Sequence, residues 1–270
     1  MDVHNAVIVV TGGGSGIGAA MAQAFAAEGA RAVVLADRNL EGARHVAESI
    51  GSVGTAFQAD VTDAAQVRSL IDTTIDRFGH LDLYCSNAGI ATGKGLEAEL
   101  SEWHNIWNVN VMATVHAAQV LLERTSVTRP IHLLITASAA GLLTNLGDAA
   151  YTATKHAAVG LAEWLAISHQ DVGLTVSCLC PQGVRTPMVT QGLAQGDLAA
   201  TVVESMGLIE PVHCAAAVIE GLRRGTFLIL PHPEVAGYVR NKAQDPDRWI
   251  ESMTRFQAKL APRPRVVEAP

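Results

Sequence analysis

Two side chains near the middle of the chain have the types and the spacing for acid–base chemistry. Tyr151 and Lys155 stand four residues apart, so on a helix they project from the same face. A free tyrosine has a pKa of about 10, too high for a base near neutrality, and a neighbouring ammonium group favours the phenolate. Ser138 lies thirteen residues before Tyr151 and offers a hydroxyl that can hold a substrate oxygen. These residues predict proton transfer at an alcohol or a ketone.

A glycine-rich segment near the N-terminus has the spacing of a phosphate-binding turn. The sequence TGGGSGIG over residues 11–18 follows an apolar run and opens an Ala-rich stretch. Glycines allow a tight turn and a close approach of the backbone, and the N-terminus of the following helix faces a pyrophosphate. In this strand–turn–helix context the segment predicts a dinucleotide site. Its binding residues are Gly12, Ser15, Gly16, Ile17 and Gly18.

One carboxylate favours NAD over NADP. Asp37 ends the next apolar run, nineteen residues after Gly18. A carboxylate at this point accepts hydrogen bonds from the ribose hydroxyls of the adenosine and repels a 2′-phosphate. Arg38 follows and is the counter-argument, since it can pair with a phosphate. No Lys or Arg lies in the glycine-rich segment, where Ser15 stands instead, so NAD is the predicted cofactor.

Short β-branched runs alternate with longer Ala-rich stretches along most of the chain. This repetition predicts right-handed crossovers and a parallel sheet covered by helices on both faces. Asp63 is the expected N-cap of the helix after the third strand, and Ser101 that of the long helix. Strands are expected at residues 6–10, 31–36, 54–59, 81–86, 131–136, 174–180 and 226–230, and helices at 16–29, 40–50, 64–78, 101–125, 149–169 and 210–224.

The pattern weakens after Pro181. Residues 187–207 have no sustained apolar stripe and are interpreted as a mobile substrate lid, and 262–270 as a flexible tail. No segment is long or polar enough to divide the chain, so residues 1–270 are expected to form one domain.

Composition excludes several classes of function. Hydrophobic residues make up 49% of the chain and aromatic residues 4%, which suits Ala-rich helices on a Val- and Ile-rich parallel sheet. The net charge of −7, without a basic cluster, argues against nucleic acid as a partner. No signal peptide or membrane span is found, and the spacing of the Cys and His residues supports no metal site. The four cysteines are expected to be buried free thiols in a cytoplasmic protein.

From Val7 to Leu230 the chain resembles the short-chain dehydrogenase/reductase family, in its compact single-domain branch. Thr11, Gly12, Gly16 and Gly18 match the TGxxxGxG motif of that family. The resemblance implies a doubly wound Rossmann fold with a seven-stranded, mainly parallel sheet. Further matches are Asp60 and Val61, which contact the adenine; Asn87, Ala88 and Gly89, which steady the sheet beside the cofactor; and Asn110, Ser138, Tyr151 and Lys155, the catalytic tetrad.

The resemblance also implies a role for each tetrad residue. Ser138 holds the substrate oxygen beside the hydroxyl of Tyr151, which accepts or donates the proton as a hydride moves to or from the nicotinamide. Lys155 hydrogen-bonds the nicotinamide ribose, and its ammonium group and the positive nicotinamide of NAD are both expected to favour the phenolate of Tyr151. Asn110 holds a water that links Lys155 to solvent.

The segment after the sixth expected strand departs from the family pattern PGxVxT. It reads Pro181-Gln182-Gly183-Val184-Arg185-Thr186. Val184 and Thr186 match positions that contact the carboxamide of the nicotinamide, and Pro181 belongs to the same cofactor site. Glycine adopts positive φ without steric cost, whereas Gln182 does not, so Gly183 is expected to take over the turn. Gln182 then either points its amide at the nicotinamide or substrate, or faces solvent.

The sequence thus predicts an NAD-dependent oxidoreductase of secondary alcohols or ketones. The alternatives are an NADPH-dependent reductase of 3-oxoacyl thioesters and a dinucleotide-binding protein without turnover. Residues 139–145, mostly small or apolar, are expected to line the substrate pocket with the lid. The resemblance implies a homotetramer, and Trp103, Trp107 and Trp164 are interpreted as core or subunit-contact residues.

Overall fold

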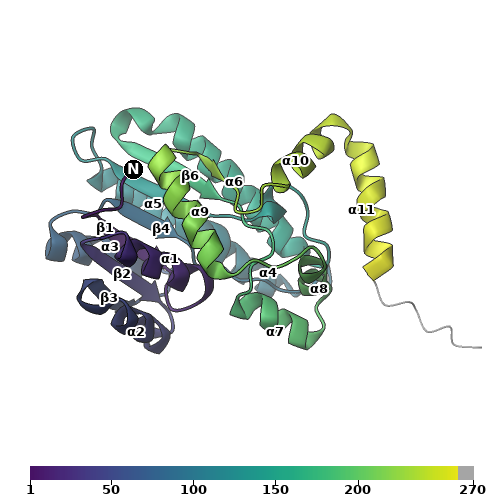
Figure 1. Ribbon diagram of the computed structural model, residues 1–270, viewed down its shortest axis with the longest axis horizontal. Coiled ribbons are helices and arrows are strands. Elements are labelled where there is room, and N and C mark those ends of the chain that lie inside the picture. Colours follow the sequence, from purple (N-terminus) through teal and green to yellow (C-terminus); the bar gives the residue numbers. More distant parts are fainter. Residues whose placement is uncertain (261–270) are drawn as a thin grey trace, which may run out of the picture.

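A seven-stranded sheet forms the centre of the molecule in a computed structural model that describes residues 1–260 (Figure 1). The strand order is β3-β2-β1-β4-β5-β6-β7, and every neighbouring pair is parallel. The predicted Rossmann topology is confirmed, with a fully parallel sheet. The strands are β1 Val7–Thr11, β2 Ala32–Asp37, β3 Gly54–Gln58, β4 Leu83–Ser86, β5 Ile131–Thr136, β6 Leu174–Leu179 and β7 Leu228–Ile229.

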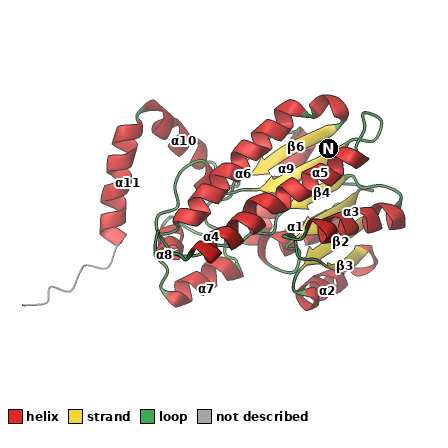
Figure 2. Cartoon of the chain, turned by 180° about the vertical axis from the view of Figure 1, so that it is seen from behind, coloured by secondary structure: helices red, strands yellow, loops and turns green. Residues whose placement is uncertain are grey.

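Helices cover both faces of the sheet and enclose two apolar cores (Figures 1 and 2). Apolar side chains of α1 Gly16–Ala27, α2 Leu40–Ser49 and α9 Pro211–Arg224 fill one core. Those of α3 Ala64–Phe78, α5 Ala113–Arg124 and α6 Ala149–Ser168 fill the other. Strands buried on both faces explain the nearly continuous apolar runs of the sequence.

Some elements have the predicted bounds because their ends carry local signals. Helix α3 begins where the side chain of Asp63 accepts hydrogen bonds from the backbone N–H groups of Ala65 and Gln66. It ends at Gly79, whose φ of 84° suits a glycine. Strand β5 also covers the predicted residues.

The helix predicted over residues 101–125 is interrupted. Helix α4 spans Leu100–Trp107, a π-helical turn follows at Asn108–Met112, and α5 then begins. The N-cap is Glu99 and not Ser101, because Glu99 and Glu102 form a reciprocal capping box. The wide turn carries Asn110 and lies beside α6.

The region after β6 is more regular than predicted. Residues 187–207, interpreted from the sequence as a mobile lid without a sustained apolar stripe, contain α7 Pro187–Gln195 and α8 Leu198–Ser205. These helices are too short to show an apolar stripe in the sequence. Beyond β7 the chain forms α10 Val235–Gln244 and α11 Pro246–Leu260. Helix α11 lies at the edge of the molecule (Figures 1 and 2), where it contacts α8. The predicted tail 262–270 lies outside the described residues.

The cysteines are free and buried, as predicted. Cys178 and Cys180 share one side of β6, with their Sγ atoms 3.7 Å apart. Among residues 1–260, no three His, Cys, Asp or Glu side chains are grouped as metal ligands. Within the same residues no helix has the length and hydropathy needed to cross a bilayer.

Candidate active site

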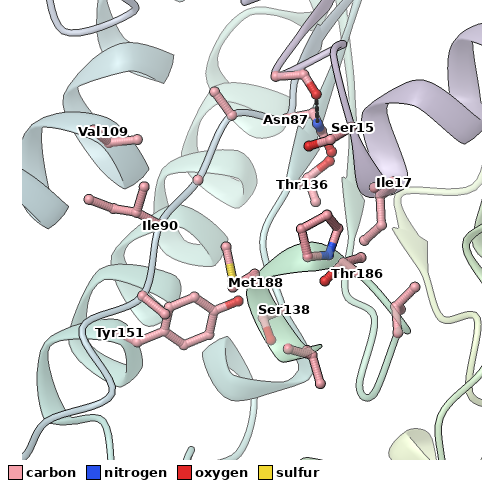
Figure 3. Close-up of a pocket in the computed structure, with 18 of the residues that line it drawn as sticks. Ser15, Ile17, Asn87, Ile90, Val109, Thr136, Ser138, Tyr151, Thr186 and Met188 are labelled. Carbon is pink, nitrogen blue, oxygen red and sulfur yellow. Dashed lines mark hydrogen bonds between the residues drawn. The ribbon is translucent and has the colours of Figure 1, made fainter. Parts of the chain in front are cut away.

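A cavity of about 580 Å³ opens at the carboxyl ends of the strands (Figure 3). Residues that follow β1, β2, β4, β5 and β6 all reach it, which is where parallel α/β sheets bind ligands. The structure brings nearly all predicted site residues together here. Only Gly18 and Asn110 are not among those that line the cavity. The others are Gly12, Ser15, Gly16, Ile17, Asp37, Arg38, Asp60, Val61, Asn87, Ala88, Gly89, Ser138, Tyr151, Lys155, Pro181, Gln182, Val184 and Thr186.

The glycine-rich turn forms a cradle at one end of the cavity. Gly12 and Gly16 have φ values of 63° and 54°, which side chains rarely adopt. Gly18 packs directly against the turn and leaves no room for a side chain, because a β-carbon there would lie 2.2 Å from the carbonyl oxygen of Gly12. The backbone of the turn can therefore approach a pyrophosphate at the N-terminus of α1.

Asp37 connects the end of β2 to this turn. One of its carboxylate oxygens accepts a hydrogen bond from the backbone N–H of Gly14 at 3.0 Å, and the other accepts from that of Asn39 at 2.9 Å. The carboxylate lines the cavity beside Arg38. It keeps acceptor capacity for the hydroxyls of a ribose.

A buried threonine joins the ends of β1 and β4. The Thr11 hydroxyl donates to the carbonyl of Cys85 at 3.1 Å and accepts from the backbone N–H groups of Asn87 and Ala88. The amide of Asn87 donates in return to the carbonyl of Thr11 at 2.9 Å. These bonds fix Asn87 and Ala88 at the wall of the cavity.

Ser138 and Tyr151 face each other across the cavity (Figure 3). Ser138 is the N-cap of a short 3₁₀ turn, and its Oγ accepts from the backbone N–H of Ala140 at 3.1 Å. Tyr151 projects from the first turn of α6, and its hydroxyl points toward Ser138 (Figure 3). The Ser138 hydroxyl itself donates to the carbonyl of Pro181 at 3.4 Å. Two adjacent hydroxyls can hold one substrate oxygen and exchange a proton with it.

Lys155 is buried one helical turn after Tyr151. Its Nζ donates to the carbonyl of Thr136 at 3.0 Å and lies 5.5 Å from the centroid of the Tyr151 ring. Burial lowers the pKa of Lys155 to about 8. The ammonium group therefore lies over the ring of Tyr151 and binds a backbone carbonyl.

The expected lowering of the Tyr151 pKa is not produced by the protein alone. Burial raises the pKa of Tyr151 to about 12, the Ser138 hydroxyl acts in the opposite direction, and the charge of Asp148 raises it further. Loss of hydration of the phenolate is the largest of these effects. A positive charge beside the hydroxyl would act in the opposite direction and favour the phenolate.

Asn110 holds the cavity wall from behind. Its Oδ1 accepts from the backbone N–H of Ile90 at 2.9 Å, and its Nδ2 donates to the Ile90 carbonyl at 3.0 Å and to Thr154 Oγ1 at 3.2 Å. A β-carbon on Gly89 would lie 3.4 Å from both Asn110 Oδ1 and Lys155 Nζ. The side chain of Asn110 thus positions the segment after β4 close to Lys155.

The turn after β6 is built differently from the prediction. Neither Gln182 nor Gly183 has positive φ. Gly183 is needed for packing, because a β-carbon there would lie 2.6 Å from the carbonyl oxygen of Gly207. The side-chain amide of Gln182 contacts the sulfur of Met206 at 3.2 Å, so it lies against the segment after α8 while Gln182 lines the cavity.

His232 fixes this turn and was not found from the sequence. Its Nδ1 accepts from the backbone N–H of Gln182 at 3.1 Å, and its Nε2 donates to the carbonyl of Gly183 at 3.1 Å. The imidazole is therefore neutral, and burial lowers its pKa. In the sequence, His232 stands in Pro231-His232-Pro233 after β7. A single histidine in a loop does not predict a particular role.

The substrate end of the cavity is lined by other residues than predicted. Residues 139–145 are not among those that line it, because Ala139 and Leu143 pack against Val235 of α10 instead. The loop after β4 and the helices of the lid replace them. Their lining residues are Ile90, Ala91, Thr92, Gly93, Met188, Val189, Gln191, Gly192, Gln195 and Asp197.

The residues present fit a nicotinamide dinucleotide. The glycine cradle and Asp37 lie at one end of the cavity, and Ser138 and Tyr151 line it as well. At the end of β5, the hydroxyl of Thr136 is buried and has no hydrogen-bond partner within residues 1–260, although Thr136 lines the cavity. A buried orphan hydroxyl in a binding cavity is typical of a group that a ligand satisfies.

Fold and cavity together define an oxidoreductase of the nicotinamide-dependent kind, and comparison with known proteins gives the family. Residues 6–196 match the family model described as short chain dehydrogenase. The chain belongs to the short-chain dehydrogenase/reductase family, and the relatives similar to it include dehydrogenases of hydroxyl compounds.

Two relatives illustrate the range of substrates. The 1-deoxy-11-beta-hydroxypentalenate dehydrogenase of Streptomyces avermitilis is 39% identical, over 72% of this chain and 73% of its own. The meso-2,3-butanediol dehydrogenase of Serratia marcescens is 34% identical, over 72% of this chain and 77% of its own.

Two solved structures are also similar. A short-chain dehydrogenase/reductase from Burkholderia phymatum, in complex with NAD, superposes with a TM-score of 0.84 at 28% identity, covering 92% of this chain and 96% of its own. A 3-ketoacyl-(acyl-carrier-protein) reductase from Brucella melitensis, complexed with NADH, gives a TM-score of 0.76 at 28% identity, covering 84% of this chain and 96% of its own.

Proposed function

We propose that this protein is an NAD-dependent oxidoreductase that moves a hydride between nicotinamide and the carbon of a secondary alcohol or ketone, with Tyr151 as the acid and base. The observation that carries the proposal is the pair of facing hydroxyls of Ser138 and Tyr151 in a cavity that also holds Asp37. An acid–base group and a dinucleotide cradle in one cavity are what reversible hydride transfer requires.

In the proposed reaction, residues 12–18 hold the pyrophosphate, Asp37 the adenosine ribose, and Asp60 and Val61 the adenine. Val184 and Thr186 orient the nicotinamide ring, which accepts or supplies the hydride and, when oxidised, adds a positive charge to the cavity. Ser138 donates a hydrogen bond to the substrate oxygen, and the Tyr151 hydroxyl takes the alcohol proton or returns it to a ketone. Lys155 binds the ribose, and Asn110 holds a water that links Lys155 to solvent.

In the proposed reaction, the charge of the nicotinamide decides whether Tyr151 is protonated. Burial holds the pKa of Tyr151 at about 12, so the residue stays a neutral donor beside a ketone. A positive charge close to the hydroxyl favours the phenolate and prepares Tyr151 to act as a base toward an alcohol. The two protonation states of Tyr151 thus correspond to the two directions of the reaction.

The proposed preference for NAD follows from the position of Asp37. Its carboxylate is anchored by Gly14 and cannot move far from the turn. A 2′-phosphate placed there meets a negative charge, while Arg38 beside it is the one group that could compensate. Similar structures that hold NAD or NADH agree with this choice.

Steady-state kinetics test the proposed function. Purified protein is screened against secondary alcohols, cyclic diols, sugars and steroids with NAD, and against the matching ketones with NADH, by following the absorbance of the reduced nicotinamide. We expect turnover with a secondary alcohol and a higher kcat/KM with NAD than with NADP. A higher kcat/KM with NADPH, above all on 3-oxoacyl thioesters, would overturn the cofactor assignment in favour of the alternative enzyme.

The proposed homotetramer uses apolar side chains that the single chain leaves exposed. Trp164 and Ile167 on α6 are 57% and 83% exposed, and Trp107 on α4 is 42% exposed. Helices α4 and α6, which carry these side chains, pack against each other. Exposed aromatic and aliphatic side chains of this kind mark protein interfaces.

The cytoplasmic location remains a prediction, which cell fractionation would check.

A further inference from the structure

Asp148 is a buried carboxylate at the start of the catalytic helix. Only 1% of the residue is exposed, and its side chain accepts four hydrogen bonds. One is the N-cap bond from the backbone N–H of Tyr151 at 2.8 Å. The other three come from a loop more than fifty residues earlier: the backbone N–H groups of Thr92 and Gly93, both at 2.7 Å, and the Thr92 hydroxyl at 2.8 Å.

These bonds join two parts of the cavity. Thr92 and Gly93 line its substrate end, and Tyr151 carries the hydroxyl that faces Ser138. The backbone N–H of Ala149 adds a hydrogen bond to the carbonyl of Lys94 at 3.1 Å. A helix N-cap needs only one acceptor, so three charge-assisted bonds to a distant loop exceed what capping requires.

The lid meets both parts at the same place. A β-carbon on Gly93 would lie 2.6 Å from a carboxylate oxygen of Asp197, the residue before α8. A β-carbon on Gly147, next to Asp148, would lie 2.8 Å from the backbone nitrogen of Ala199 in α8. The start of α8 therefore packs on the two segments that Asp148 joins, and their relative position decides where the lid can sit.

We propose that Asp148 is a positioning residue for the reaction, because its carboxylate holds the substrate-lining loop at residues 92–93 to the first turn of the helix that carries Tyr151. The inference rests on the proposed function, since it assigns the loop to the substrate and Tyr151 to the proton. Without this connection the loop and the lid lose their register with the reacting hydroxyl.

The charge of Asp148 also acts on Tyr151. After burial, and against the effect of the Ser138 hydroxyl, Asp148 raises the pKa of the Tyr151 hydroxyl. The other ionisable groups around Tyr151 are Lys155 on its own helix, Cys180 directly after β6 and Asp197 in the lid. Substitution of Asp148 adds no charge and removes one negative charge from this set. Loss of the carboxylate therefore predicts a lower pKa of Tyr151.

Asp148→Ser separates capping from positioning. Serine caps a helix well, so the bond to the N–H of Tyr151 is retained, but a single short hydroxyl cannot also bind residues 92–93. Asp63→Ser, at the N-cap of α3, is the matched control away from the cavity. Hydrogen–deuterium exchange is measured on both full-length variants. We expect faster exchange at the amides of Thr92 and Gly93 in Asp148→Ser only, and unchanged exchange there would overturn the proposal.

Kinetics give a second readout with the alcohol found in the screen. We expect kcat/KM of Asp148→Ser to fall at least about tenfold, while the Kd for NAD stays within about twofold, because residues 92–93 lie at the substrate end. The limb of the pH profile assigned to Tyr151 should move to lower pH. Wild-type values for kcat/KM and for the pH limb would show that Asp148 is only a helix cap.

Thr92→Val keeps the proposal testable if Asp148→Ser does not fold. It removes the bond from the Thr92 hydroxyl at 2.8 Å and leaves the charge in place. We expect KM to rise about threefold and the limb of the pH profile to stay at its wild-type position. An unchanged KM would contradict the proposal. If the wild-type protein oxidises no alcohol, the proposed function fails, whereas the exchange experiment still decides whether Asp148 holds the loop.

Discussion

Substitution of Gly18 by alanine tests how tightly the cofactor turn is packed. The added β-carbon would lie 2.2 Å from the carbonyl oxygen of Gly12 and 2.7 Å from Nδ2 of Asn87. Carbon and oxygen atoms that are not bonded stay more than about 3 Å apart, so the turn or the helix must move by about 1 Å. Overpacking of this kind costs about 1–3 kcal/mol, against a gain in helix propensity of at most about 1 kcal/mol.

The expected result is a net loss of about 1–2 kcal/mol in the free energy of unfolding and at least a tenfold weaker Kd for NAD. Binding suffers because Gly12, which the new methyl group displaces, lines the cavity. Urea denaturation gives the stability, and calorimetric titration with NAD gives the affinity.

Gly237→Ala in α10 is the matched control. It is also a helical glycine, and a β-carbon there would meet nothing within 4 Å. This variant should gain up to about 1 kcal/mol and bind NAD normally. If Gly18→Ala binds NAD as tightly as the wild type while both variants fold, the assignment of residues 12–18 to the pyrophosphate is contradicted.

Three further predictions address cofactor choice, pH and assembly. Asp37→Ser removes the carboxylate beside Arg38, so kcat/KM with NADP relative to NAD should rise at least about tenfold, and an unchanged ratio would contradict the role of Asp37. Burial lowers the pKa of His132 to about 4, below its unfolded value near 6.5, so its contribution to stability is complete above pH 6.5 and is lost as the pH falls toward 4. Urea midpoints should therefore drop between pH 7 and pH 5 by more in the wild type than in His132→Gln. Ile167→Asp places a charge on the exposed apolar face of α6 and should reduce the molar mass in light scattering, whereas a wild-type protein that is already monomeric would refute the tetramer.

Much of the fold could be predicted because the signals are local. Helix α3 carries its own cap at Asp63 and its own terminator at Gly79, and β5 is an uninterrupted apolar run. The π-helical turn at Asn108–Met112 has no such signal, since its residues suit an ordinary helix and the tertiary bonds of Asn110 are made with residues far along the chain. The short helices of the lid escaped detection because eight or nine residues are too few to show a period.

Some residues of the candidate site could likewise be predicted from local signals, and others could not. Motif residues such as Gly12, Asp37 and Tyr151 could be located by spacing, and the structure gathers them around one cavity. Asp148 and His232 could not be found, because each acts through hydrogen bonds to residues about fifty positions away. Residues 139–145 were assigned to the pocket by their nearness to Ser138 in sequence, but the chain turns there and packs against α10.

The acidity of Tyr151 depends on more than its spacing to Lys155. The four-residue spacing to Lys155 is correct, and the two side chains do share a helix face. The ammonium group nevertheless binds the carbonyl of Thr136, and burial dominates the pKa of Tyr151. Spacing predicts proximity, whereas the sign of a pKa shift depends on hydration and on the partners of every nearby charge.

A single-turnover measurement on Tyr151→Phe tests the central claim most directly. The variant loses only the hydroxyl that faces Ser138, and NAD and alcohol can still bind. We predict that the rate of hydride transfer falls by about 10²–10⁴-fold, as expected for loss of a general acid–base, while the Kd for NAD stays within about twofold. Hydride transfer at close to the wild-type rate, with NAD bound normally, would contradict the assignment of Tyr151 as the acid and base.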